Sequence, residues 1–225
     1  GFSSISVSLV LFISLICKKN IMYAPFFHPF VTHRHPVLSF CFFHMITKWL
    51  LFKLDAIVLS NVDSKIIFIK YNRNIFCIPL WINNYHKFKI SSKKRSGVLF
   101  VGRLEKNKGI SVLERISVDI NITVVTVSDN KLKRKNVVYC QNIDDKTLTE
   151  MYRSALITII PSQYESFSFV QLESMLHGTP VMTSQGVKIN EYIKNDFVKI
   201  VDFLTCDITQ EVNNFTKQII VNDDF

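Results

Sequence analysis

Largely apolar runs of strand length recur along the chain and are separated by segments of helical length. Residues 55–60 (DAIVLS), 98–101 (VLFV) and 122–127 (ITVVTV) are runs of this kind. Continuous apolar runs are typical of parallel strands that are covered on both faces. Strands that alternate with helices predict an α/β fold, here with Rossmann-like, doubly wound sheets.

The same pattern predicts the order of the elements. In the first half we expect helices at residues 3–16, 36–52 and 61–69, and strands at residues 20–24, 55–60 and 75–78. In the second half we expect helices at residues 109–116, 146–154 and 169–177, and strands at residues 98–101, 122–127, 136–140, 156–160 and, as the last one, 181–183.

The two halves are joined by a segment of different composition. Its sequence, NNYHKFKISSKKRS, is polar and basic and has no periodicity, which is typical of a linker. We therefore predict a partial N-terminal domain at residues 1–83, a linker at residues 84–96 and a second domain at residues 97–225. A domain takes roughly 150 residues, so we expect the first one to be incomplete.

Charge is distributed unevenly over the chain. The hydrophobic fraction of 48% and the charged fraction of 20% are typical of a globular protein, and the formal net charge is +9. Residues 1–96 hold thirteen Lys and Arg against Asp55 and Asp63, a net +11, whereas residues 97–225 carry a net −2. A basic first half suits nucleic acid, an anionic membrane surface or an acidic substrate, and charge that serves solubility alone is the alternative.

Cysteine usage indicates the compartment. The five cysteines are scattered and form no CxxC pair, so the sequence predicts a reduced, cytoplasmic protein without a zinc site or disulfides. Residues 1–16 are apolar and uncharged, but a membrane span needs about 20 apolar residues. We interpret them as a buried helix of a domain that begins further upstream, rather than as a membrane anchor.

Residues 161–181 (PSQYESFSFVQLESMLHGTPV) hold two carboxylates on either side of a predicted helix start. Ser168 can cap the helix, and Gln171 can reach back to the Ser168 amide as in a capping box. Glu165 then lies in the preceding loop and Glu173 lies inside the helix. A helix N-terminus favours a bound phosphate and carboxylates accept hydrogen bonds from hydroxyls, so the stretch indicates a sugar nucleotide.

A second candidate is the loop GRLEKNKG at residues 102–109, directly after an expected strand. Gly102 lets the backbone come close to a ligand, and Arg103 and Lys108 place two cations on one loop, where they can clamp a diphosphate. An ordinary solvated, lysine-rich turn is the alternative. The loop is not a Walker A sequence, and the chain contains no GxGxxG motif.

Together these motifs resemble those of a known family. The segments VLFVGRLEKNKG, PSQYESFSFVQLE and GTPV are similar, in this order, to elements of the retaining GT-B glycosyltransferases of glycosyltransferase family 4, also called glycosyl transferases group 1. The resemblance covers residues 97–193, and it extends to DAIVLS and IPLWIN in the first half. It implies that residues 1–83 form the acceptor-side domain and that residues 97–225 form the nucleotide-sugar-binding domain, both Rossmann-like. Against this family's length, the chain is expected to be truncated at its N-terminus and near its C-terminus.

The resemblance implies roles for the matching residues. Arg103 and Lys108 would hold the donor diphosphate and neutralise the leaving group, Glu173 would bind the ribose hydroxyls, and Glu165 would lie against the transferred sugar. His28 would lie near the reacting centre. The amides of Phe167, Ser168, Phe169 and Val170 would meet sugar hydroxyls and phosphate, and Gly102 and Ser166 would also belong to the substrate-binding site. Ser166 and Ser168 stand where the family has glycines.

These implications define the expected activity. The chain would move a sugar from a nucleoside diphosphate sugar to a hydroxyl acceptor with retention, and Glu165 is not required to be a nucleophile. No cofactor and no metal are implied, since Arg103 and Lys108 can replace a divalent cation. The acceptor would be a glycan or a lipid-linked molecule, with the basic half at an anionic membrane on its cytoplasmic, inner face.

Two other functions remain open from the sequence. A non-catalytic remnant that binds a nucleotide sugar or a glycan is the alternative, and the short first domain favours it. Nucleic-acid binding ranks third and is not expected, because the charge suits it but no reading motif is present.

Overall fold

A computed structural model describes residues 48–82 and 95–222, together with residues 12–13, 16–17, 22–24, 37 and 40–41. Contacts between Cα atoms divide the chain into two compact units. The first comprises residues 1–81 and 164–167, and the second comprises residues 82–163 and 168–225. The predicted linker falls almost wholly outside the described residues.

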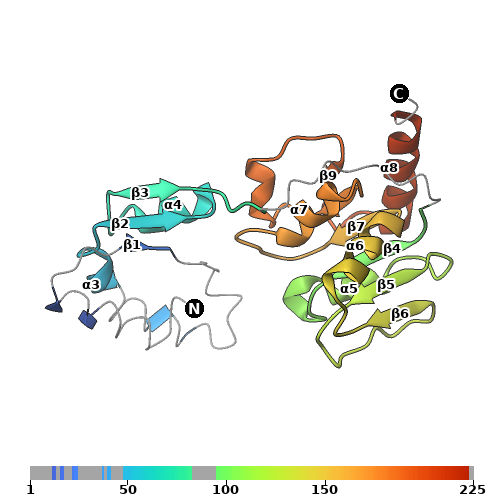
Figure 1. The fold of residues 1–225 in the computed structure, drawn as a ribbon, viewed down its shortest axis with the longest axis horizontal. Helices are drawn as coiled ribbons and strands as arrows, with labels where there is room; N and C mark the ends of the chain where they lie inside the picture. Colours follow the sequence, from blue (N-terminus) through green and yellow to red (C-terminus); the bar gives the residue numbers. More distant parts are fainter. Residues whose placement is uncertain are drawn as a thin grey trace. The chain divides into compact units, whose positions relative to one another are not determined.

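The first unit is built on a parallel sheet of three strands (Figure 1). Its order is β1 (Met22–Tyr23), β2 (Ala56–Leu59) and β3 (Ile75–Cys77), with helices α3 (Lys48–Leu51) and α4 (Val62–Phe68). The start of α4 is capped by Asn61, whose side chain accepts a hydrogen bond from the Ser64 amide. The core side chains are Leu51, Leu54, Ile57, Leu59 and Phe68.

The second unit contains a six-stranded sheet in which all neighbours are parallel. Its order is β6-β5-β4-β7-β8-β9. The strands are β4 (Val98–Val101), β5 (Ile122–Val125), β6 (Val137–Cys140), β7 (Ile157–Ile160), β8 (Val181–Thr183) and β9 (Val198–Ile200). The helices are η3 (Lys106–Lys108), α5 (Ile110–Glu114), α6 (Asp145–Ser154), α7 (Phe169–Leu176), η4 (Lys188–Glu191) and α8 (Ile208–Asn222).

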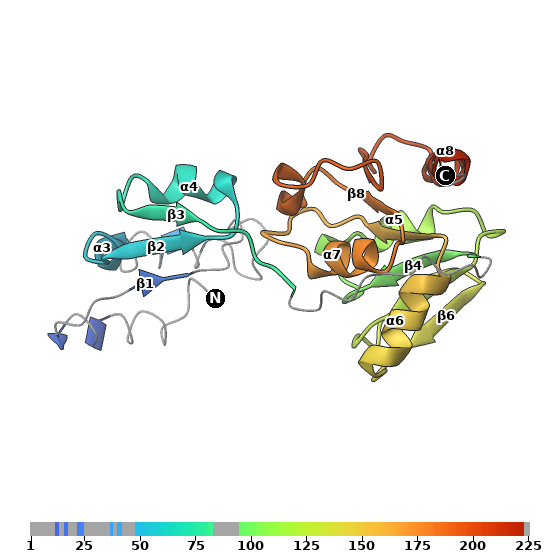
Figure 2. The ribbon, with the colours of Figure 1, turned by 45° about the horizontal axis from the view of Figure 1, so that its top comes forward.

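Side-chain alternation along the strands sends apolar groups to both faces of this sheet. On β7, Ile157 and Ile159 join the core that α5 and α8 cover. Thr158, between them, points to the opposite face, where its hydroxyl accepts a hydrogen bond from Ser174 of α7 at 2.7 Å. Figure 2 shows α6 and α7 on one side of β4 and α8 on the other, which is the doubly wound arrangement that the sequence predicts.

The structure confirms most predicted elements of the second unit, corrects which strand is the last and adds elements that were not predicted. Residues 181–183 form a strand, but they are not the last one, because β9 follows at the edge of the sheet. The chain then continues into α8, which the sequence analysis did not predict. The helix expected at residues 109–116 is α5, and the short turn η3 directly precedes it.

In the described part of the chain, no helix combines the length and the apolar character that a membrane span requires. The helix expected at residues 3–16 and most of the helix expected at residues 36–52 fall largely outside the described residues, and the end of the second one is α3.

Candidate functional site

The strand order places two loops at the point where the sheet reverses direction. From β4 the chain runs through α5 to β5, and from β7 it runs through α7 to β8 on the other side. Because β4 and β7 are neighbours, the loops that leave their carboxyl ends diverge there. In doubly wound sheets this switch point is where ligands bind. Both loops carry predicted site residues.

The loop after β4 is held in a conformation that needs glycine. Gly102 has a φ of 151°, and its amide donates to the Val125 carbonyl at 2.9 Å, so the loop starts from a fixed point on the sheet. Arg103 follows, and its guanidinium pairs with Glu105 at 3.0 Å. Since 58% of the Arg103 side chain is exposed, this pair contributes little to stability and can be exchanged for an anionic ligand.

Gly109 ends this loop and packs against the end of β7. Its φ of 78° is left-handed, and a Cβ at this position would lie 2.4 Å from the Pro161 carbonyl oxygen. A side chain larger than hydrogen is therefore excluded on two grounds, backbone conformation and space. The turn η3, which carries Lys108, precedes Gly109 directly and is thereby fixed beside the strand end.

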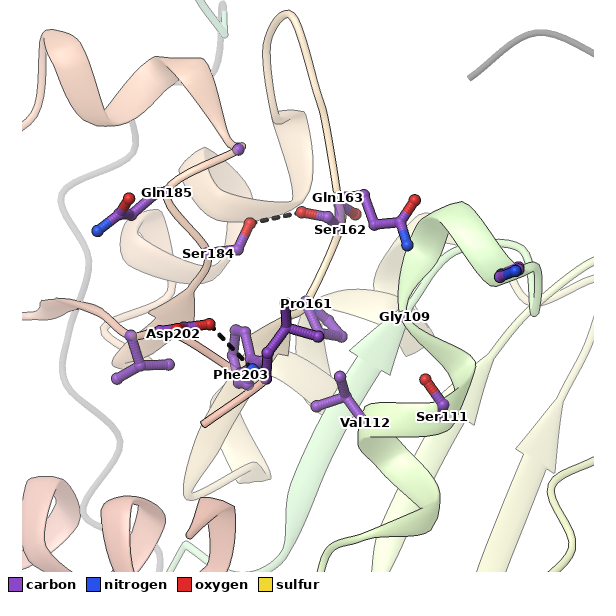
Figure 3. A pocket seen from close by; sticks show the side chains of 14 residues that line it. Gly109, Ser111, Val112, Pro161, Ser162, Gln163, Ser184, Gln185, Asp202 and Phe203 are labelled. Atoms are coloured by element: carbon purple, nitrogen blue, oxygen red, sulfur yellow. Dashed lines mark hydrogen bonds between the residues drawn. The ribbon is translucent and has the colours of Figure 1, made fainter. Parts of the chain in front are cut away.

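Residues 161–163, which leave β7, are fixed from both sides. The Gln163 amide donates to the Asn107 carbonyl at 2.9 Å. From the other side the Ser184 hydroxyl donates to the Ser162 carbonyl (Figure 3). A Cβ on Gly186 would lie 2.0 Å from the Gln163 carbonyl oxygen, so this glycine is also required by close approach. The start of the loop that carries Glu165 is thus rigid.

Helix α7 begins where the sequence predicts. Ser168 is its N-cap, with its hydroxyl accepting from the Gln171 amide at 3.3 Å. The second half of the predicted capping box is wrong, because the Gln171 side chain donates to Asn190 Oδ1 at 2.8 Å and its own Oε1 has no hydrogen-bond partner. The amides of Phe169 and Val170 lie in the first turn of the helix, at the positive end of its dipole. They can donate to an anion or a hydroxyl.

Glu173 lies in α7 and is half-buried. Its Oε2 accepts a hydrogen bond from the Tyr152 hydroxyl at 2.8 Å. Burial raises the pKa of the Glu173 carboxyl, the Tyr152 hydrogen bond opposes that rise, and the charge of Asp145 adds to it. Because a carboxyl group has two oxygens, Glu173 can accept a further hydrogen bond from a ligand hydroxyl. This hydrogen bond is stronger when the carboxyl is ionised.

A hollow of about 440 Å³ lies at the carboxyl ends of β7, β8 and β9 (Figure 3). Apolar side chains line much of it, and Ser111, Gln163 and Gln185 are among the polar residues of its wall. Its walls include parts of both switch-point loops, but none of the predicted site residues lines it. The hollow therefore adjoins the predicted site without coinciding with it.

The predicted site residues fall into three groups. The second unit contains Gly102, Arg103, Lys108, Ser168, Phe169, Val170 and Glu173. Glu165, Ser166 and Phe167 group with the first unit by their contacts. His28 lies outside the described residues. No metal site was predicted, and within residues 48–82 and 95–222 no three His, Cys, Asp or Glu side chains gather so as to hold an ion.

Sequence reasoning missed Tyr152, which touches Glu173 from a position 21 residues earlier. A tyrosine near the end of a helix carries no local signal of such a contact. Arg95, in the predicted linker, was also missed as a structural residue. Its guanidinium donates to the carbonyls of Tyr152, Ala155 and His177 and to the Thr179 hydroxyl, at 2.6 to 3.3 Å.

Comparisons with known proteins agree with these motifs. The family described as glycosyl transferases group 1 matches residues 82–205. An uncharacterised 41.2 kDa protein in the cps region of Klebsiella pneumoniae is 32% identical over 112 residues, covering 46% of this chain and 31% of that protein. An uncharacterised glycosyltransferase of Methanocaldococcus jannaschii, MJ1607, is 35% identical over 115 residues, covering 44% and 30%.

Solved structures share the fold at low sequence identity. Sucrose-phosphate synthase (tll1590) from Thermosynechococcus elongatus gives a TM-score of 0.69 at 17% identity, covering 96% of this chain and 63% of that one. Anabaena Alr3699/HepE in complex with UDP gives 0.62 at 15% identity, covering 96% and 67%. These similarities support the α/β assignment and GT-B architecture.

The chain spans about a third of the length of the two curated relatives above, 31% and 30%. The segment that matches the family, residues 82–205, is nevertheless more than half of the present chain. It contains the loop after β4 with Arg103 and Lys108, the loop after β7, and helix α7 with Glu173. On this match, the chain belongs to the glycosyl transferases group 1 family.

Proposed function

We propose that this chain moves a sugar from a nucleoside diphosphate sugar to a hydroxyl acceptor, as a retaining enzyme of glycosyltransferase family 4. The observation that carries the proposal is the switch point of the second sheet. There the loop with Arg103 and Lys108 and the helix with Glu173 leave adjacent parallel strands. Two cations and a carboxylate at one sheet edge match the diphosphate and the ribose of a nucleotide.

Each residue has a distinct role in this proposal. Arg103 exchanges its ion pair with Glu105 for the diphosphate, which its planar guanidinium binds with two hydrogen bonds. Lys108 contributes a single positive charge. Both stabilise the negative charge that grows on the leaving nucleoside diphosphate as the anomeric bond breaks. The acceptor hydroxyl attacks on the face from which the nucleotide departs, which retains the configuration at the anomeric carbon.

Glu173 and the start of α7 bind the rest of the donor. The Glu173 carboxyl accepts hydrogen bonds from the ribose hydroxyls, and the amides of Phe169 and Val170 donate to phosphate or sugar oxygens. We assign Glu165, with the backbone of Ser166 and Phe167, to the transferred sugar, and His28 to the reacting centre. Anabaena Alr3699/HepE, of similar fold, is described in complex with UDP and with UDP-glucose, which supports a nucleotide-sugar donor here.

We propose that transfer requires no cofactor and no metal ion. Arg103 and Lys108 supply the positive charge that a divalent cation would otherwise place on the diphosphate. Nucleotide affinity should then be the same in EDTA and in magnesium. A loss of affinity on chelation, restored by added magnesium, would contradict this part of the proposal.

The acceptor and the location follow from charge. Residues 1–96 carry a net +11, which favours a glycan or lipid-linked acceptor at an anionic membrane surface, on the cytoplasmic side. Sedimentation with vesicles that contain anionic lipid, compared with neutral vesicles, tests this. If equal amounts of the protein sediment with both vesicle types, the proposed contact with an anionic membrane is wrong.

Isothermal titration with UDP and GDP tests the donor site. We expect one of them to bind, and we expect a Lys108→Ala, Glu173→Ala double variant to lose that binding. A double variant at exposed positions of α6, Lys146→Ala with Glu150→Ala, makes the same change in charge and should bind normally. Unchanged binding by the first variant would refute the site assignment.

Turnover is tested separately from binding. Release of nucleotide from a panel of donor sugars in the presence of candidate acceptors should be detectable above spontaneous hydrolysis. Binding without any turnover across the panel would instead make the chain a nucleotide-sugar-binding module.

A further inference from the structure

The Tyr152–Glu173 hydrogen bond links a buried side chain to the carboxylate of the proposed ribose site. Tyr152 lies in the last turn of α6, and Glu173 lies in α7, on the same face of the sheet (Figure 2). The hydroxyl of Tyr152 is 2.8 Å from Glu173 Oε2. Only 1% of Tyr152 is exposed, so this contact is shielded from water on the tyrosine side.

The Tyr152 side chain is held in one place by its surroundings. It packs with Leu99 of β4 and Ala155, and the His177 ring stacks on it at a centroid distance of 5.7 Å and an interplanar angle of 24°. The carbonyl of Tyr152 accepts hydrogen bonds from the Thr179 hydroxyl and from Arg95. Neither the ring nor the backbone can move without breaking these contacts, so the hydroxyl occupies a fixed position.

This fixed hydroxyl is always a donor. Burial and the neighbouring Glu173 carboxylate raise the pKa of Tyr152 above its ordinary value, so the phenol keeps its proton at neutral pH. A carboxylate has two acceptor oxygens, and the phenol has one proton to give. The bond engages Oε2 and restricts rotation of the carboxylate, and Oε1 is the second acceptor oxygen of the group.

We propose that Tyr152 is a positioning residue that orients Glu173 to receive the ribose hydroxyls of the nucleotide. This inference rests on the proposed function and adds to it a residue outside the matched motifs. Tyr152 does not touch the nucleotide. It acts by holding the carboxylate in the orientation that binding requires, so that no rotamer freedom is lost when the ligand arrives.

The experiment measures discrimination between nucleotides with and without ribose hydroxyls. UDP and GDP are each titrated against their 2′,3′-dideoxy counterparts with the 225-residue chain and its variants. Hydrogen bonds to a charged carboxylate predict a preference for the ribonucleotide of roughly ten-fold or more in the unaltered chain. Tyr152→Phe, which preserves the ring packing, should reduce this ratio to about three-fold or less. A merely structural role would weaken binding of both nucleotides equally and leave the ratio unchanged.

Two further variants make the outcome decisive. Glu173→Gln can still accept from Tyr152 but lacks the charge, and it should also lower the ratio. Tyr139→Phe removes a hydroxyl that accepts from the Leu132 amide at 2.7 Å in the same unit, and it should leave the ratio unchanged. Thermal melts confirm that each variant is folded at the temperature of titration.

The failure of the inference and the failure of the proposed function give different results. If Glu173→Gln abolishes discrimination but Tyr152→Phe retains it in full, the positioning role is refuted and the ribose site stands. If neither nucleotide binds, or the unaltered chain does not discriminate, both the ribose site and the role of Tyr152 are refuted.

Discussion

Replacing Gly109 by alanine tests how tightly the loop after β4 is packed against the end of β7. An added Cβ would lie 2.4 Å from the Pro161 carbonyl oxygen and 2.7 Å from Pro161 Cγ, distances that force the backbone to shift. The residue also has a φ of 78°, which costs a non-glycine residue about 1 to 3 kcal/mol. Overpacking adds about 1 to 3 kcal/mol, so we expect Gly109→Ala to destabilise the fold by about 2 to 6 kcal/mol.

Gly102→Ala is the matched control for this prediction. Gly102 also has a positive φ, 151°, but the nearest atom to an added Cβ is Phe100 Cζ at 3.6 Å, an ordinary contact. Only the backbone cost of about 1 to 3 kcal/mol then applies. Urea unfolding followed by far-UV circular dichroism gives both free energies of unfolding. If Gly109→Ala is no more destabilising than Gly102→Ala, within about 0.5 kcal/mol, the packing argument is wrong.

Two more predictions concern α7. Burial raises the pKa of Glu173, so the folded chain binds its proton more tightly than the unfolded chain, and this group costs stability as the pH rises from 4.5 through the folded pKa. Glu173→Gln should therefore become progressively more stable than the unaltered chain over that pH range in denaturant unfolding, and a constant difference would refute this. At the N-cap, Ser168→Ala should cost about 1 kcal/mol and Ser168→Gly only a few tenths, because alanine is a poor cap. Equal losses for both substitutions in the same assay would contradict the capping role.

Much of the fold could be read from local sequence. The strands at residues 98–101 and 181–183 have the predicted bounds, because short apolar runs between polar turns leave few alternatives. The N-cap at Ser168 was likewise predicted, since capping depends on residues within one turn.

The C-terminal elements show where the prediction failed. Strand β9 (Val198–Ile200) is three residues long and includes a lysine, so its sequence alone does not distinguish it from a loop. Helix α8 contains threonines and asparagines, which are weak helix formers, but it packs Ile208, Val212, Phe215 and Ile219 against the sheet. The spacing of these four residues is helical and would have revealed the helix.

The local sequence was sufficient to predict which residues are available at the site and in which order they follow. It placed Arg103 and Lys108 after one strand, and Ser168 and Glu173 after another, because motifs of this kind are contiguous in the chain. How these residues are held depends on the folded arrangement of the chain. Tyr152 reaches Glu173 from another helix, and Gly109 and Gly186 fix residues 161–163 from opposite sides. Such contacts depend on strand order and on atoms brought together from distant positions, for which the local pattern carries no signal.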